Sequence, residues 1–244
     1  MNKEIFVLSL RQLLGKRRTF ALIGLALLPL LVALVVRNSG SSADPVDPVD
    51  NAVVNYGLIV TTLLPLVTLV LSTTSLGMEV EDGTIVYLLS KPLPRAQVIT
   101  AKLAASWLPA GILVALSAAL SGTIALQGSD SSSLILAFVV SSAIGALAYS
   151  GLFLFLSLLT TRALIVGLIY VFIWEGLVTE LFAGTRIFSI RQFTLGVGDL
   201  LTESTKLDAH LGGPTALALM IAVTLAAVLL AIRRLNRFES RSLF

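Results

Sequence analysis

Six long apolar blocks constrain this chain more than any other feature of its sequence. A bilayer core about 30 Å thick is crossed by roughly 20 apolar helical residues, and each block meets or approaches that length. Unpaired backbone groups are not tolerated in lipid, and the blocks do not alternate as barrel strands would, so each is expected to be a helix. The predicted fold class is an all-α membrane protein with six transmembrane helices, at residues 20–36, 53–76, 103–126, 134–159, 163–182 and 215–232.

Composition excludes a soluble domain. Of the 244 residues, 56% are hydrophobic and only 13% charged, whereas an ordinary globular domain is about a quarter charged. There is no cysteine and only one histidine, His210, which lies in a polar segment. These counts predict no metal site and no catalytic residue in this chain.

The basic residues predict the orientation of the chain. Most of the 17 Lys and Arg residues lie in the N-terminal segment, in the connections after the second and fourth blocks, and at the C-terminus. The positive-inside rule therefore predicts that both termini face the cytoplasm, in agreement with an even number of spans. No small-x-small cleavage pattern follows residue 36, so the first block is expected to be an uncleaved span.

Two polar flanks leave alternatives open. In residues 1–18, the side chains of Phe6, Leu10, Leu13 and Leu14 share one helical face. This pattern fits an amphipathic cytoplasmic helix lying on the membrane, or an ordinary basic flank. Residues 183–214 contain a moderately apolar stretch with a turn at Gly196 and Gly198. It either dips back into the membrane or forms an external helix that binds a partner.

The cytoplasmic connection at residues 77–102 has a more distinctive pattern. Three acidic residues come directly after the second block, followed by Gly83 and Thr84. Asp82 or Thr84 is suited to cap a short helix over residues 85–89, whose side chains are mostly apolar although the segment should be in water. Apolar side chains exposed to water favour a partner surface, and the alternative is a loop packed against its own helix ends. Pro94 suits the first turn of a new helix that runs through Lys102 into the third block.

This segment resembles the signature of ABC-2 type transporter permeases, and the topology of the whole chain is similar to theirs. The likeness extends to the small six-span permeases encoded apart from their ATPase, such as the permease of the nitrous-oxide reductase maturation transporter. The residues that carry it form an acidic start, a Gly-Thr pair, an apolar stretch with Pro and Arg, and a distal Lys102. The ATPase-coupling residues that the resemblance implies are Glu79, Glu81, Asp82, Gly83, Thr84, Ile85, Leu88, Leu89, Pro92 and Arg95.

The resemblance implies an exporter subunit of a prokaryotic plasma membrane. Residues 77–102 would dock on a separate ABC ATPase, which would bind ATP and Mg; this chain has no phosphate-binding loop and would bind no cofactor. A second permease copy or homologue would complete the transporter, with the first, second and fifth blocks lining the path. The apolar blocks favour lipids, hydrophobic peptides or drugs as substrates, and nothing indicates nucleic acid.

Glu175 and Glu180 are the intramembrane polar candidates. Glu175 interrupts the apolar fifth block, and Glu180 lies nearer its outer end. An ionisable residue at membrane depth is costly and therefore a functional candidate. Glu175 is expected to be protonated, paired with Arg186 or Arg191, or exposed to a water-filled cavity; alternatively the block ends early and Glu175 lies at the interface.

Two rival functions follow from the same residues. A gradient-driven secondary transporter or channel would use Glu175 as a proton or cation site and need no ATPase. The scarcity of other polar residues in the spans counts against this function. A membrane scaffold would bind an extracytoplasmic accessory protein through residues 183–214. An intramembrane enzyme is disfavoured, because the spans do not offer a nucleophile together with a general base.

Overall fold

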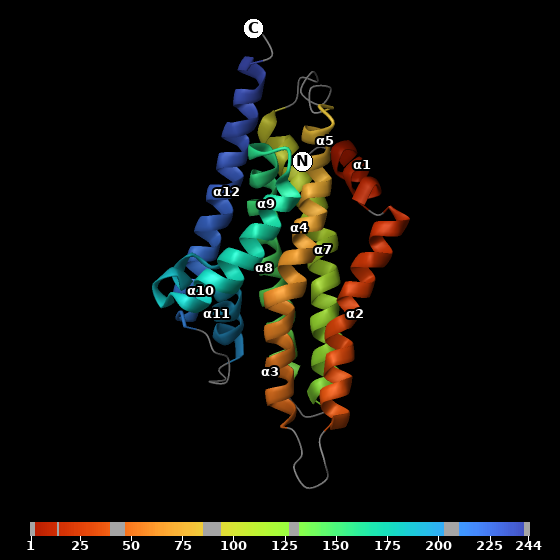
Figure 1. Ribbon diagram of the computed structural model, residues 1–244, viewed down its shortest axis with the longest axis vertical. Helices are drawn as coiled ribbons and strands as arrows, with labels where there is room; N and C mark the ends of the chain where they lie inside the picture. Colours follow the sequence, from red (N-terminus) through yellow and green to blue (C-terminus); the bar gives the residue numbers. More distant parts are fainter. Residues whose placement is uncertain are drawn as a thin grey trace.

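The computed structural model describes residues 3–13, 15–39, 47–84, 94–126, 132–202 and 210–241, and every regular element in these ranges is a helix (Figure 1). The prediction of an all-α chain is confirmed. The elements are α1 (Lys3–Leu13), α2 (Lys16–Ser39), α3 (Pro48–Leu58), η1 (Ile59–Leu63), α4 (Leu64–Ser72), η2 (Thr73–Gly77), α5 (Met78–Glu81), α7 (Arg95–Leu126), α8 (Ser132–Leu159), α9 (Ala163–Ile169), η3 (Tyr170–Val178), α10 (Thr179–Leu181), η4 (Ala183–Phe188), α11 (Ile190–Thr202) and α12 (Gly213–Arg241).

Six helical stretches are long and apolar enough to cross a membrane, which confirms the predicted number. We call them spans one to six: Phe20–Asn38, Pro48–Glu81, Arg95–Leu126, Ser132–Leu159, Ala163–Leu181 and Gly213–Asn236.

Spans two and three extend beyond their apolar blocks. Span two begins with Pro48 at the first helical position, where a missing N–H costs nothing. The Asp47 carboxylate caps it by accepting a 2.9 Å hydrogen bond from the Val49 N–H. Span three begins at Arg95, directly after Pro94. Polar residues can continue a helix beyond its apolar part, because the backbone hydrogen bonds of a helix are internal. Hydropathy alone therefore places a helix start too late and a helix end too early.

Wide π-helical turns interrupt spans two and five. In span two they are η1 and η2, and in span five η3 includes Glu175. The Leu64 N–H bonds to the Ile59 carbonyl, five residues back, just before Pro65, which has no N–H to donate. Such turns change which side chains face a neighbouring helix and are frequent at functional sites.

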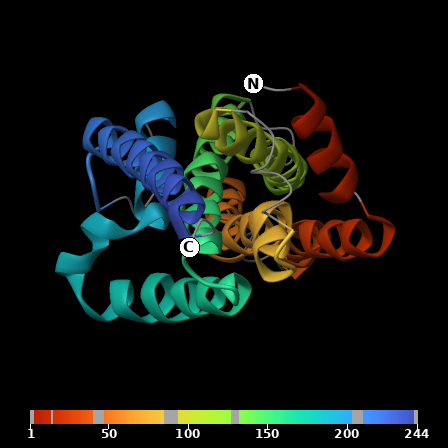
Figure 2. The same cartoon turned by 90° about the horizontal axis from the view of Figure 1, so that it is seen from above.

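Helix α8 lies at the centre of the bundle. It packs against α4 and α7 on one side and against α11 and α12 on the other (Figure 2). Small residues permit this close packing: a Cβ added at Gly145 of α8 would lie 2.5 Å from the Thr194 hydroxyl of α11. Tyr56 of span two stacks on Phe138 of α8 with ring centroids 4.0 Å apart, and its hydroxyl is 2.7 Å from the Ser141 hydroxyl.

The two chain ends lie on the same side of the bundle. Helix α1, helix α5 and the last turns of α12 are all at the upper end in Figure 1. Helix α1 packs against α7 and η2, and Leu13 on it is fully buried. The segments that the sequence assigns to the cytoplasm therefore lie at a single end of the structure, and their orientation stays a prediction.

The segment between spans five and six folds back onto the bundle. The turn predicted at Gly196 and Gly198 is wrong, because both lie inside the continuous helix α11, where small residues permit close packing. Helix α11 packs against α8 and α12, and residues 192–198 are buried. In Figure 1 it lies well above the lower ends of α3 and α7. Whether this segment is re-entrant depends on the position of the membrane and stays a prediction.

Candidate functional site

The acidic end of span two is shaped by a helix stop. Helix α5 ends at Glu81, and Gly83 adopts a φ of +67°. A left-handed residue just beyond a helix is usually glycine, because a Cβ is strained there. The Gly83 N–H bonds back to the Val80 carbonyl at 3.3 Å, and the Thr84 hydroxyl bonds to the Glu79 carbonyl at 3.4 Å. The Gly-Thr pair of the signature thus turns the chain away from span two.

An ion pair joins the two ends of the connection between spans two and three. Lys102 on α7 is only 2% exposed, and its Nζ lies 2.6 Å from Oε1 of Glu79 and 2.8 Å from the Ser75 carbonyl. Glu79 is 21% exposed, and its Oε2 is buried without a hydrogen-bond partner among the described residues. The carboxylate and the carbonyl together compensate the buried ammonium, because desolvation strongly disfavours an unpaired charge. We call this arrangement the clamp: Glu79, Lys102 and the Ser75 carbonyl.

The clamp contains a residue that sequence reasoning did not select as a site. Lys102 was placed in the signature but not among the coupling residues. Its signal was available, since Lys102 is the last cation of α7 before its long apolar stretch and requires an acceptor there. The sequence did not indicate that the Ser75 carbonyl in η2 and the Glu79 carboxylate would face the same ammonium.

The other coupling candidates are only partly placed. Glu81, Asp82, Gly83 and Thr84 are exposed, and Arg95 is half-buried at the start of α7. The expected helix over 85–89 lies outside the described residues, as do the side chains of Ile85, Leu88, Leu89 and Pro92. The role of this segment in coupling stays a prediction.

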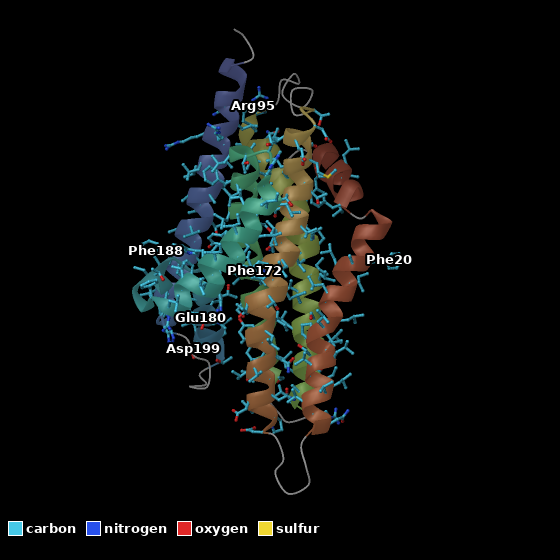
Figure 3. The ribbon with its side chains drawn as sticks, viewed as in Figure 1. Phe20, Arg95, Phe172, Glu180, Phe188 and Asp199 are labelled. Atoms are coloured by element: carbon cyan, nitrogen blue, oxygen red, sulfur yellow. The ribbon has the colours of Figure 1, made fainter. Side chains whose placement is uncertain are left out.

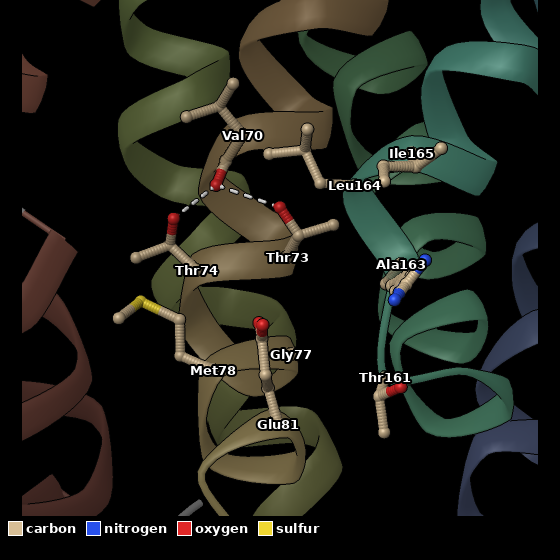
Figure 4. A pocket seen from close by; sticks show the side chains of 11 residues that line it. Val70, Thr73, Thr74, Gly77, Met78, Glu81, Thr161, Ala163, Leu164 and Ile165 are labelled. Atoms are coloured by element: carbon tan, nitrogen blue, oxygen red, sulfur yellow. Dashed lines mark hydrogen bonds between the residues drawn. The ribbon is translucent and has the colours of Figure 1, made fainter.

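A cavity lies between spans two and five at this same end. Its volume is about 470 Å³. Figure 4 shows Thr73 and Thr74 on one wall and Leu164 and Ile165 on the other. The lining residues are Val70, Thr73, Thr74, Gly77, Met78, Glu81, Thr161, Arg162, Ala163, Leu164 and Ile165.

Glu175 is buried on span five and is surrounded by hydrogen-bond donors. It is 3% exposed. Its Oε1 accepts bonds from the Tyr170 hydroxyl at 2.9 Å and from the Ile190 N–H at 3.0 Å, and its Oε2 accepts a short bond from the Ser189 hydroxyl. Ser189 and Ile190 are the start of α11. The carboxylate therefore satisfies the first turn of that helix, where acidic groups are favoured by unpaired N–H groups and the helix dipole.

Of the alternatives left open for Glu175, pairing with Arg186 or Arg191 is not what the described residues show. Arg191 forms its ion pair with Glu180, at 2.9 Å, and Arg186 donates from Nε to the Thr179 carbonyl at 3.1 Å. Glu180 is on the outer surface, where its side chain is 60% exposed (Figure 3). Sequence reasoning missed Tyr170 and Ser189 as the partners of Glu175. Tyr170 could have been predicted as a donor to Glu175, because it lies five residues earlier on the same helix. Ser189 lies beyond span five, and only the fold brings it to Glu175.

The remaining surface of the bundle is strongly apolar. Phe20 and Phe188 point outward, as Figure 3 shows, and are 73% and 64% exposed. Such contiguous apolar surface is suited to lipid or to another membrane helix. Within the described ranges, no three His, Cys, Asp or Glu side chains gather as a metal site would require; the expected lack of a metal stays a prediction.

Comparison with known families agrees with this architecture. A family model described as "ABC-2 family transporter protein" matches residues 15–182, from the start of α2 to the end of span five. No curated protein matches the chain. Members of this family are permease subunits of ABC transporters, which transport across membranes, are not themselves catalytic and in general work with an ABC ATPase. This chain belongs to the ABC-2 family of transporter proteins.

Proposed function

We propose that the chain is the permease subunit of an ATP-driven exporter in a prokaryotic plasma membrane, with both termini in the cytoplasm. ATP and Mg would be bound by a separate ATPase subunit. The observation that carries the proposal is the clamp: it joins the ends of spans two and three across the segment at residues 77–102. Force applied to that segment would then reach both spans together rather than bend one of them.

The family match and the charge distribution support this orientation. Most basic residues fall at the end of the bundle that holds α1, α5 and the end of α12, as the positive-inside rule requires of a cytoplasmic side. Within that arrangement α1 would be the connecting helix, and α11 would be re-entrant from the outside. The finer likeness to the nitrous-oxide reductase maturation permease belongs to this proposal as well.

A second permease copy or homologue is part of the proposal. The most apolar windows of spans one, five and six are each only 22% buried within one chain. Lipid alone would satisfy such surfaces, but a path for substrate needs an interface, and the family resemblance favours spans one, two and five as its lining. Rigid-body rocking of two such bundles is a known way to open a path.

The geometry around Glu175 favours this function over a gradient-driven transporter. Three donors from the chain itself occupy the carboxylate. A proton or cation site has to be reachable by the transported ion, whereas Glu175 is only 3% exposed and its carboxylate faces donors of its own chain. We therefore assign Glu175 to holding the start of α11 on span five.

Affinity purification tests the ATPase partner. The tagged chain is purified in mild detergent from its native host, and bound proteins are identified by mass spectrometry. An ABC ATPase is expected with the unmodified chain and should be lost when Leu88 and Leu89 are both changed to Lys. The matched control changes Leu200 and Leu201 to Lys, an adjacent leucine pair on α11 that is 43% and 44% exposed and lies outside residues 77–102.

Each result has a definite meaning. Loss of the ATPase from the Leu88/Leu89 variant alone supports docking through residues 77–102. An ATPase retained by both variants contradicts that docking surface. Recovery of the unmodified chain as a stable oligomer without an ATPase contradicts the exporter itself.

A further inference from the structure

The cavity between spans two and five has a charged mouth and an apolar interior. Glu81 is the last residue of span two, and Arg162 directly precedes span five. Both line the cavity, both are exposed, and neither forms an ion pair with any residue in the part of the chain that the structure describes. One carboxylate and one guanidinium therefore face the same space at the head-group end of two spans.

On the span-two wall of the cavity, the two threonine hydroxyls donate to their own helix. The Thr73 hydroxyl donates to the Leu69 carbonyl at 2.7 Å, and the Thr74 hydroxyl donates to the Val70 carbonyl at 2.6 Å. The opposite wall is formed by Leu164 and Ile165, as Figure 4 shows. A sugar or a free ion would leave polar groups unpaired against this wall, which is costly. The interior suits a hydrocarbon tail.

The mouth selects the head group. A guanidinium binds phosphate through paired charge-assisted bonds. A lone Arg162 would favour any anionic head group, but the nearby Glu81 carboxylate repels a net negative charge and attracts an ammonium. A head group that carries one phosphate and one ammonium satisfies both side chains. The volume of about 470 Å³ falls within the range of small-molecule sites, so it can hold a head group with the first part of its tails.

We propose that this cavity binds a zwitterionic phospholipid of the inner leaflet, with its phosphate on Arg162, its ammonium toward Glu81 and its acyl chains along Val70, Leu164 and Ile165. The inference rests on the proposed function for its orientation, and it gives that function a substrate class: a lipid-like zwitterion taken up sideways between spans two and five. The ATPase is not needed for binding, so the site is testable on the chain alone.

The test uses the full chain in lipid nanodiscs with a phosphatidylethanolamine probe that carries a photo-reactive diazirine near its glycerol. Mass spectrometry locates the cross-link. Labelling is expected at Leu164, Ile165 or Val70, and unlabelled phosphatidylethanolamine should compete better than phosphatidylglycerol. The Arg162→Gln variant should lose about tenfold in labelling, the effect of one charge-assisted bond. The Glu81→Gln variant should instead shift the preference toward phosphatidylglycerol.

Two controls remove the same charges from outside the cavity. Asp82→Asn is one residue from Glu81 but does not line the cavity, and Arg37→Gln lies at the far end of α2. All four side chains are exposed, so the variants should fold. Both controls are expected to label like the unmodified chain.

Three results would overturn the proposal. The first is equal labelling of the Arg162→Gln and Arg37→Gln variants. The second is labelling spread over the outer faces of all six spans with no preference for the cavity. The third is capture of a second copy of the chain at Leu164 or Ile165 in place of the lipid. A failure of lipid capture leaves ATPase co-purification unchanged, so it is distinguishable from a failure of the exporter assignment.

Discussion

Two glutamates in this protein, one half-buried and one buried, are stabilised in opposite ways. Glu79, at one end of the bundle, is paired with the buried ammonium of Lys102. Glu175, on span five, receives two hydroxyls and a backbone N–H and no cation from the described residues. Removing Glu79 leaves the Lys102 ammonium without its counter-ion, whereas removing Glu175 leaves neutral donors without an acceptor. The same substitution should therefore have different effects at the two positions.

The difference also separates what the two acids hold in place. The clamp connects two spans at their ends, across the segment proposed to meet the ATPase. Glu175 connects a span to the first turn of α11, which is not itself a span. An acidic residue at membrane depth therefore does not by itself indicate a transport site; its partners decide its role.

The largest effect is expected from Glu175→Leu. This change leaves the Tyr170 hydroxyl, the Ser189 hydroxyl and the Ile190 N–H without their acceptor. At roughly 1–3 kcal/mol for each buried donor, the free energy of unfolding should fall by about 4 kcal/mol. Denaturant titration of the chain in mixed micelles measures it. The control Glu180→Leu removes an exposed ion pair and should cost under about 1 kcal/mol. Equal losses in both variants would contradict the anchoring role.

Glu79→Leu should have the next largest effect. It leaves the Lys102 ammonium, only 2% exposed, with the Ser75 carbonyl as its one acceptor. Stranding a buried charge costs about 3 kcal/mol or more. The same titration measures this loss. Restoration of most of the stability by the double variant Glu79→Leu/Lys102→Met would show that the cost comes from the stranded charge.

Lys102→Met should cost less than Glu79→Leu although it breaks the same ion pair. Glu79 is 21% exposed and can turn toward water, so its charge is not trapped. The expected loss is about 1 kcal/mol, near that of an ordinary exposed pair. If Lys102→Met lowered the free energy of unfolding more than Glu79→Leu does, Glu79 rather than Lys102 would be the partner whose charge is trapped in the clamp.

The smallest effect is expected from Glu175→Gln. The amide oxygen can accept the bonds from Tyr170 and Ile190, and the amide nitrogen can donate to the Ser189 hydroxyl, which also accepts from the Gln192 N–H at 3.2 Å. The unfolding free energy should change by less than about 1 kcal/mol. Hydrogen exchange at the Ile190 amide should stay slow in this variant and become fast in Glu175→Leu. Fast exchange in both would mean that the negative charge, rather than the hydrogen-bond geometry, holds α11.

The sequence predicted the spans well and the ends of span two less well. All six spans were found because hydrocarbon demands long apolar helices. The helix start expected at Pro94 is confirmed, since α7 begins at Arg95. Span two runs from Pro48 to Glu81 and so exceeds its apolar block at both ends, because polar turns continue a helix without loss of backbone bonds. The π-helical turns of spans two and five were not predicted, because they depend on contacts with neighbouring helices.

The candidate site was predicted in part. Glu175 was selected from its position, since an acid inside an apolar block is unusual, and Glu79 was selected through the resemblance to the ABC-2 signature. Their partners were not. Arg186 and Arg191 are close to Glu175 in sequence, yet Arg191 pairs with Glu180 and Arg186 with a backbone carbonyl. The cavity between Glu81 and Arg162 joins residues from two spans that are far apart in the chain, and no local pattern indicates it.

The sequence by itself determined that this protein is a six-span helical bundle, because length and hydropathy suffice for that, and the match of a family model to residues 15–182 makes it a member of the ABC-2 family. Only the tertiary structure decided which charges meet. Hydropathy is a property of one segment and acts against a uniform solvent, the lipid. An ion pair or hydrogen bond requires two groups within about 3 Å, and helix packing brings together Lys102 with Glu79 and Ser189 with Glu175.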